Sequence, residues 1–314
     1  MTLTDVAVDV RGLRKSYGDK HAVDGLDLRV RRGEVFAVLG PNGAGKTTTV
    51  EILEGFRDRD AGQVSVLGED PATAGRAWRS RIGVVMQDSR DLSEATVGEL
   101  VRHFAGYYPA PRDPDEVIEA VGLRDKARTR CRRLSGGQRR RVDVALGIIG
   151  DPELLFLDEP TTGFDPQARR AFWELVAGLR RGGTTVLLTT HYLDEAEQLA
   201  DRVAVVRDGQ VVALGAPADL GGRAARQAVV RWTQDGTTRE VRTDHPTRTV
   251  AELAGLAGVA AGGEVPGLQV LRASLEDVYL SLIGADGLGG ADGPDGADGL
   301  GGAGGVGAAE EQGR

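Results

Sequence analysis

The chain has 314 residues, of which 40% are hydrophobic, enough for one large domain or two modest ones with a sizeable core. No apolar run approaches the ~18 residues of a membrane span, and the first residues show neither the basic nor the apolar segment of a secretion signal, so we expect a cytoplasmic protein. The net charge of −8 disfavours nucleic-acid binding because no basic surplus neutralises phosphates, and the single cysteine, Cys131, excludes disulfides within the chain and multi-cysteine zinc sites.

The first motif is a glycine-rich loop after an apolar strand. Glu34–Leu39 predicts the strand, a helix is expected from Lys46 through Glu54, and the loop between them reads Gly40-Pro41-Asn42-Gly43-Ala44-Gly45-Lys46-Thr47-Thr48. In such a phosphate loop, glycines turn successive N–H groups toward the β- and γ-phosphates of a nucleotide, at the positive end of the helix dipole. Lys46 would add a point charge, and Thr47 a hydroxyl for Mg²⁺. The loop therefore predicts a nucleotide-binding α/β protein.

A second glycine-containing segment, called the signature run below, lies in the middle of the chain. It reads Leu134-Ser135-Gly136-Gly137-Gln138 and is followed by the basic run Arg139–Arg141, which is typical of a solvated helix face. The residues after it predict a helix, so the Ser135 hydroxyl and the amides of the two glycines would lie at a positive helix N-terminus. We therefore expect an anion to bind there.

Two carboxylates end the next predicted strand. The apolar run Leu154–Leu157 is followed by Asp158 and Glu159, as in a buried parallel strand whose C-terminal end meets a ligand. Asp158 suits the shell of a Mg²⁺ ion, directly or through a water, and Glu159 suits a general base that polarises the attacking water. Such a strand end alone is more often a cap or an acidic turn. Behind a phosphate loop, it predicts nucleotide hydrolysis.

From about residue 216 the sequence pattern changes. Strand-like runs around Asp235-Gly236 predict a hairpin, followed by a short helix over Thr249–Leu256, a strand over Leu268–Leu271 and a capped helix over Ser274–Leu282. We therefore predict a nucleotide-binding domain over residues 1–215, with a helical subdomain over about 88–150, and a small α+β appendage over 216–283. Residues 284–314 are rich in Gly, Ala and Asp without periodicity, which predicts a disordered tail.

The order of these motifs resembles that of the nucleotide-binding subunits of ATP-binding cassette (ABC) transporters. The match continues with Tyr17, Gln87, the turn Thr162-Gly163-Phe164-Asp165, and His191 after the apolar run Thr185–Leu188, and it covers roughly residues 3 to 215. The resemblance implies the P-loop NTPase fold of that family, a mixed sheet with flanking helices and a helical subdomain that carries the signature run. Phe164 stands where leucine is more usual, a conservative change that leaves Asp165 in place.

The resemblance also implies a role for each residue. Tyr17 would stack on adenine, Gln87 would reach Mg²⁺ and the attacking water, and His191 would hydrogen-bond the γ-phosphate and hold Glu159 and the water in line. The catalytic group would be Lys46, Gln87, Glu159 and His191, and the Mg²⁺ ligands Thr47, Gln87 and Asp158. Ser135, Gly136, Gly137, Gln138 and Asp165 would act in trans, on ATP held by a second copy of the chain. Asp165 before Pro166 also fits an ordinary turn.

The chain is most similar to bacterial exporters of the drug-resistance and antibiotic self-protection type, through the runs Glu159–Pro166 and Ser274–Leu280. The resemblance implies an ATPase that uses ATP and Mg²⁺ and forms a homodimer on a separate ABC-2 type membrane permease, at the cytoplasmic face of the cell membrane. The cargo would be a hydrophobic small molecule, an antibiotic or a lipid. Two alternatives remain open: a non-transport cassette whose ATP-driven dimerisation regulates a soluble complex, and an importer ATPase.

Overall fold

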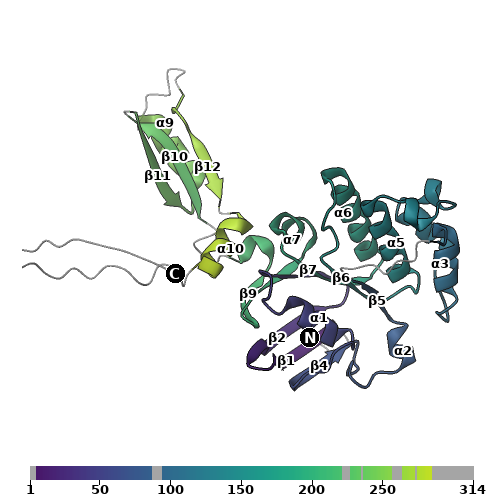
Figure 1. The fold of residues 1–314 in the computed structure, drawn as a ribbon. Coiled ribbons are helices and arrows are strands. Elements are labelled where there is room, and N and C mark those ends of the chain that lie inside the picture. Colours follow the sequence, from purple (N-terminus) through teal and green to yellow (C-terminus); the bar gives the residue numbers. More distant parts are fainter. Residues whose placement is uncertain are drawn as a thin grey trace, which may run out of the picture.

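The centre of the molecule is a six-stranded mixed sheet (Figure 1). The computed structural model describes residues 5–86, 94–220, 227–234, 236–256, 264–272 and 274–284, so Gln87 and residues 285–314 of the predicted tail 284–314 lie outside the described residues. The strand order is β5-β6-β7-β3-β8-β9, in which β9 alone runs antiparallel to its neighbour. The strands are β3 (Val35–Leu39), β5 (Ile82–Val85), β6 (Leu154–Asp158), β7 (Thr185–Thr190), β8 (Arg202–Arg207) and β9 (Gln210–Gly215). The mixed sheet of the sequence prediction is confirmed.

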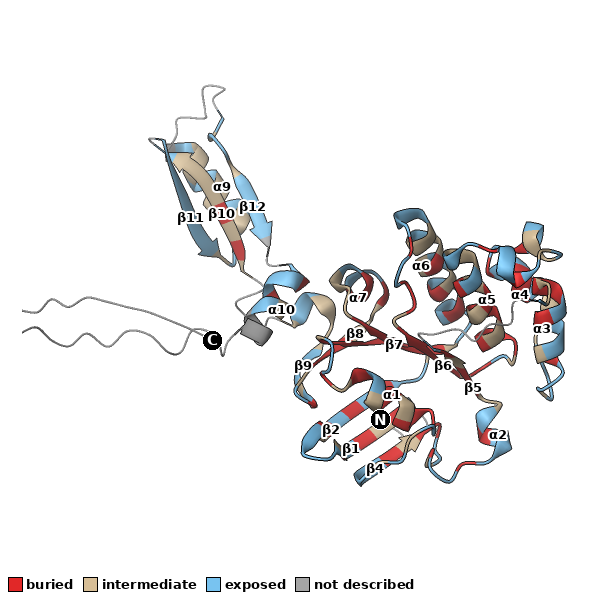
Figure 2. Cartoon of the chain, in the orientation of Figure 1, coloured by how far each residue is buried: buried red, intermediate tan, exposed pale blue. Residues whose placement is uncertain are grey.

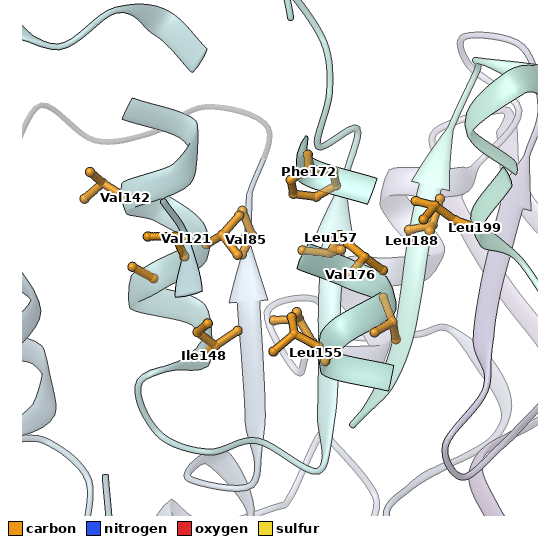
Figure 3. Packing of buried hydrophobic residues seen from close by; sticks show 14 of the residues in the cluster. Val85, Val121, Val142, Ile148, Leu155, Leu157, Phe172, Val176, Leu188 and Leu199 are labelled. Carbon is orange, nitrogen blue, oxygen red and sulfur yellow. The ribbon is translucent and has the colours of Figure 1, made fainter. Parts of the chain in front are cut away.

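The central strands are buried on both faces, which explains their almost unbroken apolar runs. In β6, Leu155 and Leu157 point into one core and Leu154 and Phe156 into the other, as the two-residue period of a strand requires. Figure 3 shows the first core, where strand side chains meet those of the helices. These helices are α5 (Gly136–Ile148), α6 (Pro166–Arg181) and α7 (Leu193–Leu199).

An antiparallel sheet covers the opposite face of the central sheet. It consists of β2 (Lys20–Arg31), β1 (Val6–Tyr17) and β4 (Ala61–Val66), in the order β2-β1-β4. Its inward side chains join the second core, together with those of α1 (Lys46–Leu53), the helix that follows the phosphate loop. Buried positions of this sheet are red in Figure 2. The short helix α2 (Arg76–Arg79) adds the fully buried Trp78, whose indole N–H donates to the Val66 carbonyl. The phosphate loop therefore leads into a helix that is fixed within this core.

Between β5 and β6 the chain forms a group of helices. They are α3 (Val97–Ala105), α4 (Pro114–Ala120), the 3₁₀ turns η2 (Arg124–Lys126) and η3 (Cys131–Arg133), and α5. Thr96 begins α3 with a reciprocal capping box to Glu99, and Asp113 caps α4 ahead of Pro114. Buried residues on α3, α4 and α5 belong to the first core. The helix that carries the signature run is thus packed directly against the central sheet.

The C-terminal part forms a separate three-stranded antiparallel sheet with a helix. The strands β10 (Ala228–Gln234), β11 (Thr237–Thr243) and β12 (Gln269–Arg272) pair in the order β11-β10-β12, and α9 (Pro246–Leu256) packs on β10. This sheet stands away from the main body (Figure 1). The short turn η4 (Pro217–Asp219) precedes the sheet in sequence. The helix α10 (Leu275–Gly284) follows the sheet and lies beside α7. The α+β appendage is confirmed, whereas its exact limits stay a prediction. Within the described ranges, every helix is too short or too polar to cross a bilayer.

Candidate functional site

The C-terminal ends of β3, β6 and β7 bring several predicted site residues together. The phosphate loop leaves β3, Asp158 ends β6 with Glu159 next to it, and His191 directly follows β7. These strands are parallel neighbours in the order β6-β7-β3, so their ends share one edge of the sheet. A cleft of about 460 Å³ opens there, and its described walls are Tyr17, Lys20, Ala22, Asn42, Gly43, Gly45, Lys46, Thr47, Thr48 and Glu159.

The geometry of the phosphate loop leaves backbone donors available at the start of α1. Gly45 has a φ of 97°, and a Cβ atom at this position would lie 2.1 Å from the Ala22 carbonyl oxygen, so only glycine fits. No side chain caps α1, and its first turn contains no acidic residue. The first intrahelical bond is donated by the N–H of Thr49, which leaves the N–H groups of Lys46, Thr47 and Thr48 ahead of it. A helix start of this kind fits a polyphosphate.

Lys46 is a buried cation held against the loop. Its side chain is 5% exposed, and Nζ donates to the carbonyl oxygens of Gly40 at 2.8 Å and Pro41 at 3.1 Å. Nζ also lies 3.9 Å from Oε1 of Glu159. Burial lowers the pKa of Lys46, while the carboxylates of Glu159 and Asp158 oppose this shift. The ammonium group therefore lies between the loop and the carboxylates, where it can neutralise a phosphate.

Thr189, near the end of β7, connects the two carboxylate residues. Its hydroxyl donates to Oδ1 of Asp158 and accepts a 3.1 Å bond from the N–H of Glu159. That N–H also lies 3.2 Å from the Thr189 carbonyl oxygen. Burial raises the pKa of Asp158, and the Thr189 hydroxyl lowers it in part. Sequence reasoning missed Thr189, although a hydroxyl residue at the end of an apolar strand is a signal that could have indicated it.

Glu159 lies between a cation and an imidazole. Its Oε2 is 3.3 Å from Nδ1 of His191, and its side chain is 12% exposed. The imidazole is more open and lies against the ring of Tyr192, with the ring centroids 4.1 Å apart and the ring planes tilted by 39°. A carboxylate at the mouth of a phosphate-binding cleft, with a basic group on each side, is placed to accept a proton from a water. The structure thus brings Lys46, Glu159 and His191 together.

Tyr17 ends β1 at the wall of the cleft and is 43% exposed. Two cations approach its ring: the guanidinium of Arg57 lies 5.4 Å from the ring centroid, and Nζ of Lys15 lies 5.8 Å from it. Arg57 is itself held by Glu51, to which its Nε donates at 2.5 Å. An exposed aromatic surface of this kind suits a planar base. Neither Lys15 nor Arg57 was indicated by the sequence.

The signature run begins α5, as the sequence predicted. Ser135 is the N-cap residue: its hydroxyl accepts from the N–H of Gln138 at 3.2 Å, and Oε1 of Gln138 accepts from the N–H of Ser135 at 3.0 Å. The first intrahelical bond runs from Arg139 to Ser135, so the N–H groups of Gly136 and Gly137 precede it. None of these residues is among the described walls of the cleft around Lys46. The run therefore presents its donors outside its own chain's cleft.

Asp165 also lies outside the described walls of that cleft. It is the N-cap residue of α6, and its carboxylate accepts a 2.8 Å bond from the N–H of Ala168. Phe164 beside it is buried and packs edge-on against Phe172, with ring centroids 6.0 Å apart. The local capping role of Asp165 corresponds to the ordinary turn that the sequence left open.

The prediction of a solvated face for Arg139–Arg141 is wrong for Arg140. Arg139 is exposed and Arg141 half-buried, but Arg140 is only 8% exposed, and its guanidinium donates to three backbone carbonyls. Consecutive helix residues point in directions about 100° apart, so a basic run cannot lie on one face. Arg140 is the member that points at the ends of β5 and β6.

Two buried acids also escaped sequence reasoning. Glu54 follows α1 and is 8% exposed; burial, together with the charges of Asp158 and Glu51, raises its pKa to about 8. Glu195 on α7 is fully buried, and burial raises its pKa to about 7. Both follow residues of the site closely in sequence, but nothing in their local patterns predicts burial.

The donors for a metal ion are few. Within the described ranges, no group of three or more His, Cys, Asp or Glu side chains surrounds a common point. The hydroxyl of Thr47 and the carboxylate of Asp158 are oxygen donors, which Mg²⁺ prefers, and an ion that also binds nucleotide phosphates needs only one or two protein ligands. The donor set therefore fits a Mg²⁺ ion shared with a nucleotide.

Comparisons with known proteins agree with this geometry. The sequence pattern of the family described as "ABC transporter" matches residues 23–162. The chain is 43% identical over 310 residues to the daunorubicin resistance ATP-binding protein DrrA3 of Streptomyces coeruleorubidus, covering 90% of this chain and 98% of that protein. It is 40% identical over 307 residues to the Nod factor export ATP-binding protein I of Ralstonia nicotianae, covering 89% of this chain and 94% of that protein.

Solved structures show the same fold. The match to a nucleotide-free ATP-binding cassette from an ABC transporter covers 67% of this chain and 91% of the cassette chain, with a TM-score of 0.60 and 25% identity. The match to an ATP-binding subunit of an ABC transporter covers 88% of this chain and 99% of the subunit's chain, with a TM-score of 0.65 and 23% identity. The predicted α/β architecture is confirmed by both.

Proposed function

This chain belongs to the ABC transporter family, and we propose that it is the ATP-hydrolysing subunit of an exporter whose membrane permease is a separate polypeptide. The observation that carries the proposal is the meeting of Lys46, Glu159 and His191 beside the phosphate loop. The relatives named for daunorubicin resistance and Nod factor export favour export over import. We propose a hydrophobic small molecule, an antibiotic or a lipid as the cargo.

In the proposed reaction, the phosphate loop binds the β- and γ-phosphates of ATP, and Tyr17 stacks on the adenine. Lys46 neutralises the charge that builds up on the transferred phosphoryl group. Glu159 accepts a proton from the water that attacks the γ-phosphorus, and His191 keeps that carboxylate and the water in line. The products are ADP and inorganic phosphate.

We propose that Mg²⁺ is held by Thr47, Asp158 and Gln87. When bound, it supplies positive charge that withdraws electrons from the phosphates. The buried Asp158 carboxylate has a raised pKa, and a nearby cation would favour its charged form. Its bond from Thr189 fixes the orientation in which it would meet the ion.

A second copy of the chain completes each site in the proposed enzyme. Ser135, Gly136, Gly137, Gln138 and Asp165 would act on the ATP held by the partner's phosphate loop. Two features support this: the amides of Gly136 and Gly137 precede the first intrahelical bond, and the signature run is not part of the wall around Lys46. Closure of a head-to-tail homodimer would then pass motion to the permease.

We propose that an apolar segment of that permease docks in a groove of about 660 Å³ on this chain. Its walls include Phe56, Met86, Phe104 and Tyr108, and Phe56 and Met86 are 62% and 47% exposed. Exposed side chains of this size, gathered in one groove, are typical of an interaction site. Met86 directly precedes Gln87, so a segment bound there would lie next to the proposed Mg²⁺ ligand. Such docking would hold the ATPase at the cytoplasmic face of the membrane.

The docking proposal predicts that Phe56→Asp loses copurification with the permease from detergent-solubilised membranes, because it replaces an exposed apolar side chain of the groove by a charge. The matched control is Tyr107→Asp, which changes an aromatic residue that is 69% exposed and outside the groove walls. Both variants should keep their basal ATP hydrolysis. Equal recovery of permease with Phe56→Asp and with the control would contradict this docking place.

The hydrolysis proposal is tested by Glu159→Gln, which keeps the shape of the side chain and removes the base. We expect the ATP turnover number to fall at least about 100-fold, with ATP affinity retained. The control is Glu197→Gln, which removes an exposed carboxylate on α7 and should leave turnover unchanged. Phosphate release and nucleotide binding are measured side by side, and wild-type turnover in Glu159→Gln would refute the assignment.

A further inference from the structure

Arg140 joins the helix of the signature run to the strand ends of its own cleft. Its Nη2 donates to the carbonyl oxygen of Asp158 at 2.7 Å, its Nε to that of Pro160 at 3.1 Å, and its Nη1 to that of Met86. The residue is only 8% exposed. A guanidinium taken out of water is costly unless its N–H groups are satisfied, and here three of them are satisfied by backbone carbonyls.

The three carbonyls belong to two segments of the proposed site. Met86 comes directly before Gln87, Asp158 is the last residue of β6, and Pro160 comes directly after Glu159. The guanidinium thus holds both sides of Glu159 and the residue before Gln87 at fixed distances from one another.

The other end of the connection is the signature run. Arg140 follows Gly136 by four residues, so the two lie one above the other on the same face of α5. The capping box of Ser135 and Gln138 fixes the first turn of that helix. A helix turn is rigid, so α5 keeps the backbone of Arg140 and the amides of Gly136 and Gly137 in a fixed relation to one another.

We propose that Arg140 is a positioning residue that couples the two ATP sites of the dimer. The inference rests on the proposed function, in which the strand ends of a subunit serve its own ATP and the signature run serves the ATP of its partner. Arg140 connects these two halves within one subunit. ATP bound beside Asp158 therefore sets the position of the signature run that completes the other site.

The planar fork of arginine is needed for this role. A lysine ammonium keeps the charge but is a compact group, and it cannot reach three carbonyls in different directions with the same fixed geometry. Glutamine is neutral and can donate to fewer carbonyls. Arg140→Lys and Arg140→Gln therefore break the connection in two chemically different ways, and loss of folding by one leaves the other for the measurement.

The experiment uses full-length heterodimers with two affinity tags. One subunit carries Glu159→Gln, so it binds ATP without hydrolysing it, and the other is catalytically intact. Arg140→Lys or Arg140→Gln is then placed only in the Glu159→Gln subunit, and single-turnover hydrolysis by the intact subunit is measured. In this arrangement the Glu159→Gln subunit contributes no hydrolysis, so the substitution reaches the intact subunit's ATP only through residues presented across the dimer interface, among them the signature run.

We expect hydrolysis by the intact subunit to slow about 10- to 100-fold, because small misplacements of positioning groups have effects of this size. ATP affinity of each isolated subunit should not change. Arg141→Lys in the same subunit is the control, because Arg141 is half-buried and lies on another face of α5 than Arg140. An unchanged rate with both Arg140 variants would overturn the coupling role. A parent heterodimer without hydrolysis would instead overturn the proposed function.

Discussion

Glu159 holds a backbone conformation that few residues adopt, with a φ of 43°. Left-handed backbone at a residue with a side chain costs on the order of 1–3 kcal/mol and persists where the surroundings enforce it. Here Thr189 does so, because both its carbonyl and its hydroxyl lie within bonding distance of the Glu159 N–H. The strained turn directs the carboxylate toward Lys46 and His191. The residue with the strained backbone is therefore the proposed base.

Glu54 makes the stability of the fold depend on pH. Its folded pKa of about 8 lies above the ordinary 4.5, so the folded chain retains a proton that the unfolded chain loses between these values. The stabilisation is complete below about pH 4.5 and is lost as the pH rises through about 8. Between pH 6 and 8.5, this one group should lower the free energy of unfolding by about 2–3 kcal/mol.

Glu54→Gln removes the titrating group and keeps the shape, so it should abolish that part of the pH dependence. Urea unfolding of both proteins at pH 6 and pH 8.5 gives the comparison, and the difference between the two proteins isolates Glu54 from all other titrating groups. We expect the wild type to lose about 2–3 kcal/mol more than the variant. Parallel losses would show that Glu54 titrates near its ordinary value in the folded chain.

Residues within contiguous motifs could be predicted, and residues that act across segments could not. Lys46, Glu159 and His191 each follow the end of a recognisable apolar strand, and the C-terminal ends of parallel strands lie along one edge of a sheet. Arg140 gave no such signal, since its burial depends on carbonyls that are 18 to 54 residues away in sequence. Thr189 is similar, because its bond to Asp158 spans 31 residues.

At the scale of elements, helix starts and buried strands were the most predictable features. The phosphate-loop helix, the cap of α5 and the strands β3 and β6 begin and end within one residue of their predictions. The strand order β5-β6-β7-β3-β8-β9 could not be predicted, because crossover connections leave no local pattern. The same holds for the outer sheet, in which β4 pairs with β1 across the phosphate loop and α1.

The last described helix, α10, was predicted correctly as a capped helix, but its packing was not foreseen. Ser274 caps it through Asp277, and Leu275 is 3% exposed within the first core, whereas Leu280 is 58% exposed. A leucine buried in this way contributes to the main body even though it follows the separate C-terminal sheet in sequence. The helix therefore fastens the end of the appendage to α7.

Leu275→Ala should lower the free energy of unfolding by about 2–5 kcal/mol, because it removes buried methyl groups and leaves a cavity. Leu280→Ala in the same helix should change it by less than about 0.5 kcal/mol, since that side chain is exposed. Urea denaturation of the two variants provides the measurement. Equal effects would contradict the packing of α10 against the main body.

At the scale of the whole molecule, the proposed dimer would divide each ATP site between two copies of the chain. The cleft around Lys46 contains the phosphate loop and Glu159 but not Ser135 or Gly137. The signature run has its own helix N-terminus, with amides ahead of the first intrahelical bond. A head-to-tail homodimer would join each half to its complement, so ATP would act as the link between the two copies.

The central claim, that two copies share each ATP, is tested most directly by measuring the oligomeric state of Glu159→Gln with ATP by size exclusion with light scattering. The proposed shared sites predict a dimer with ATP and a monomer without it. They also predict that adding Ser135→Arg restores the monomer, because the large side chain fills the place of the partner's γ-phosphate while each copy still binds ATP. A Glu159→Gln protein that stays monomeric with ATP bound, or a dimer that Ser135→Arg leaves intact, would contradict the claim.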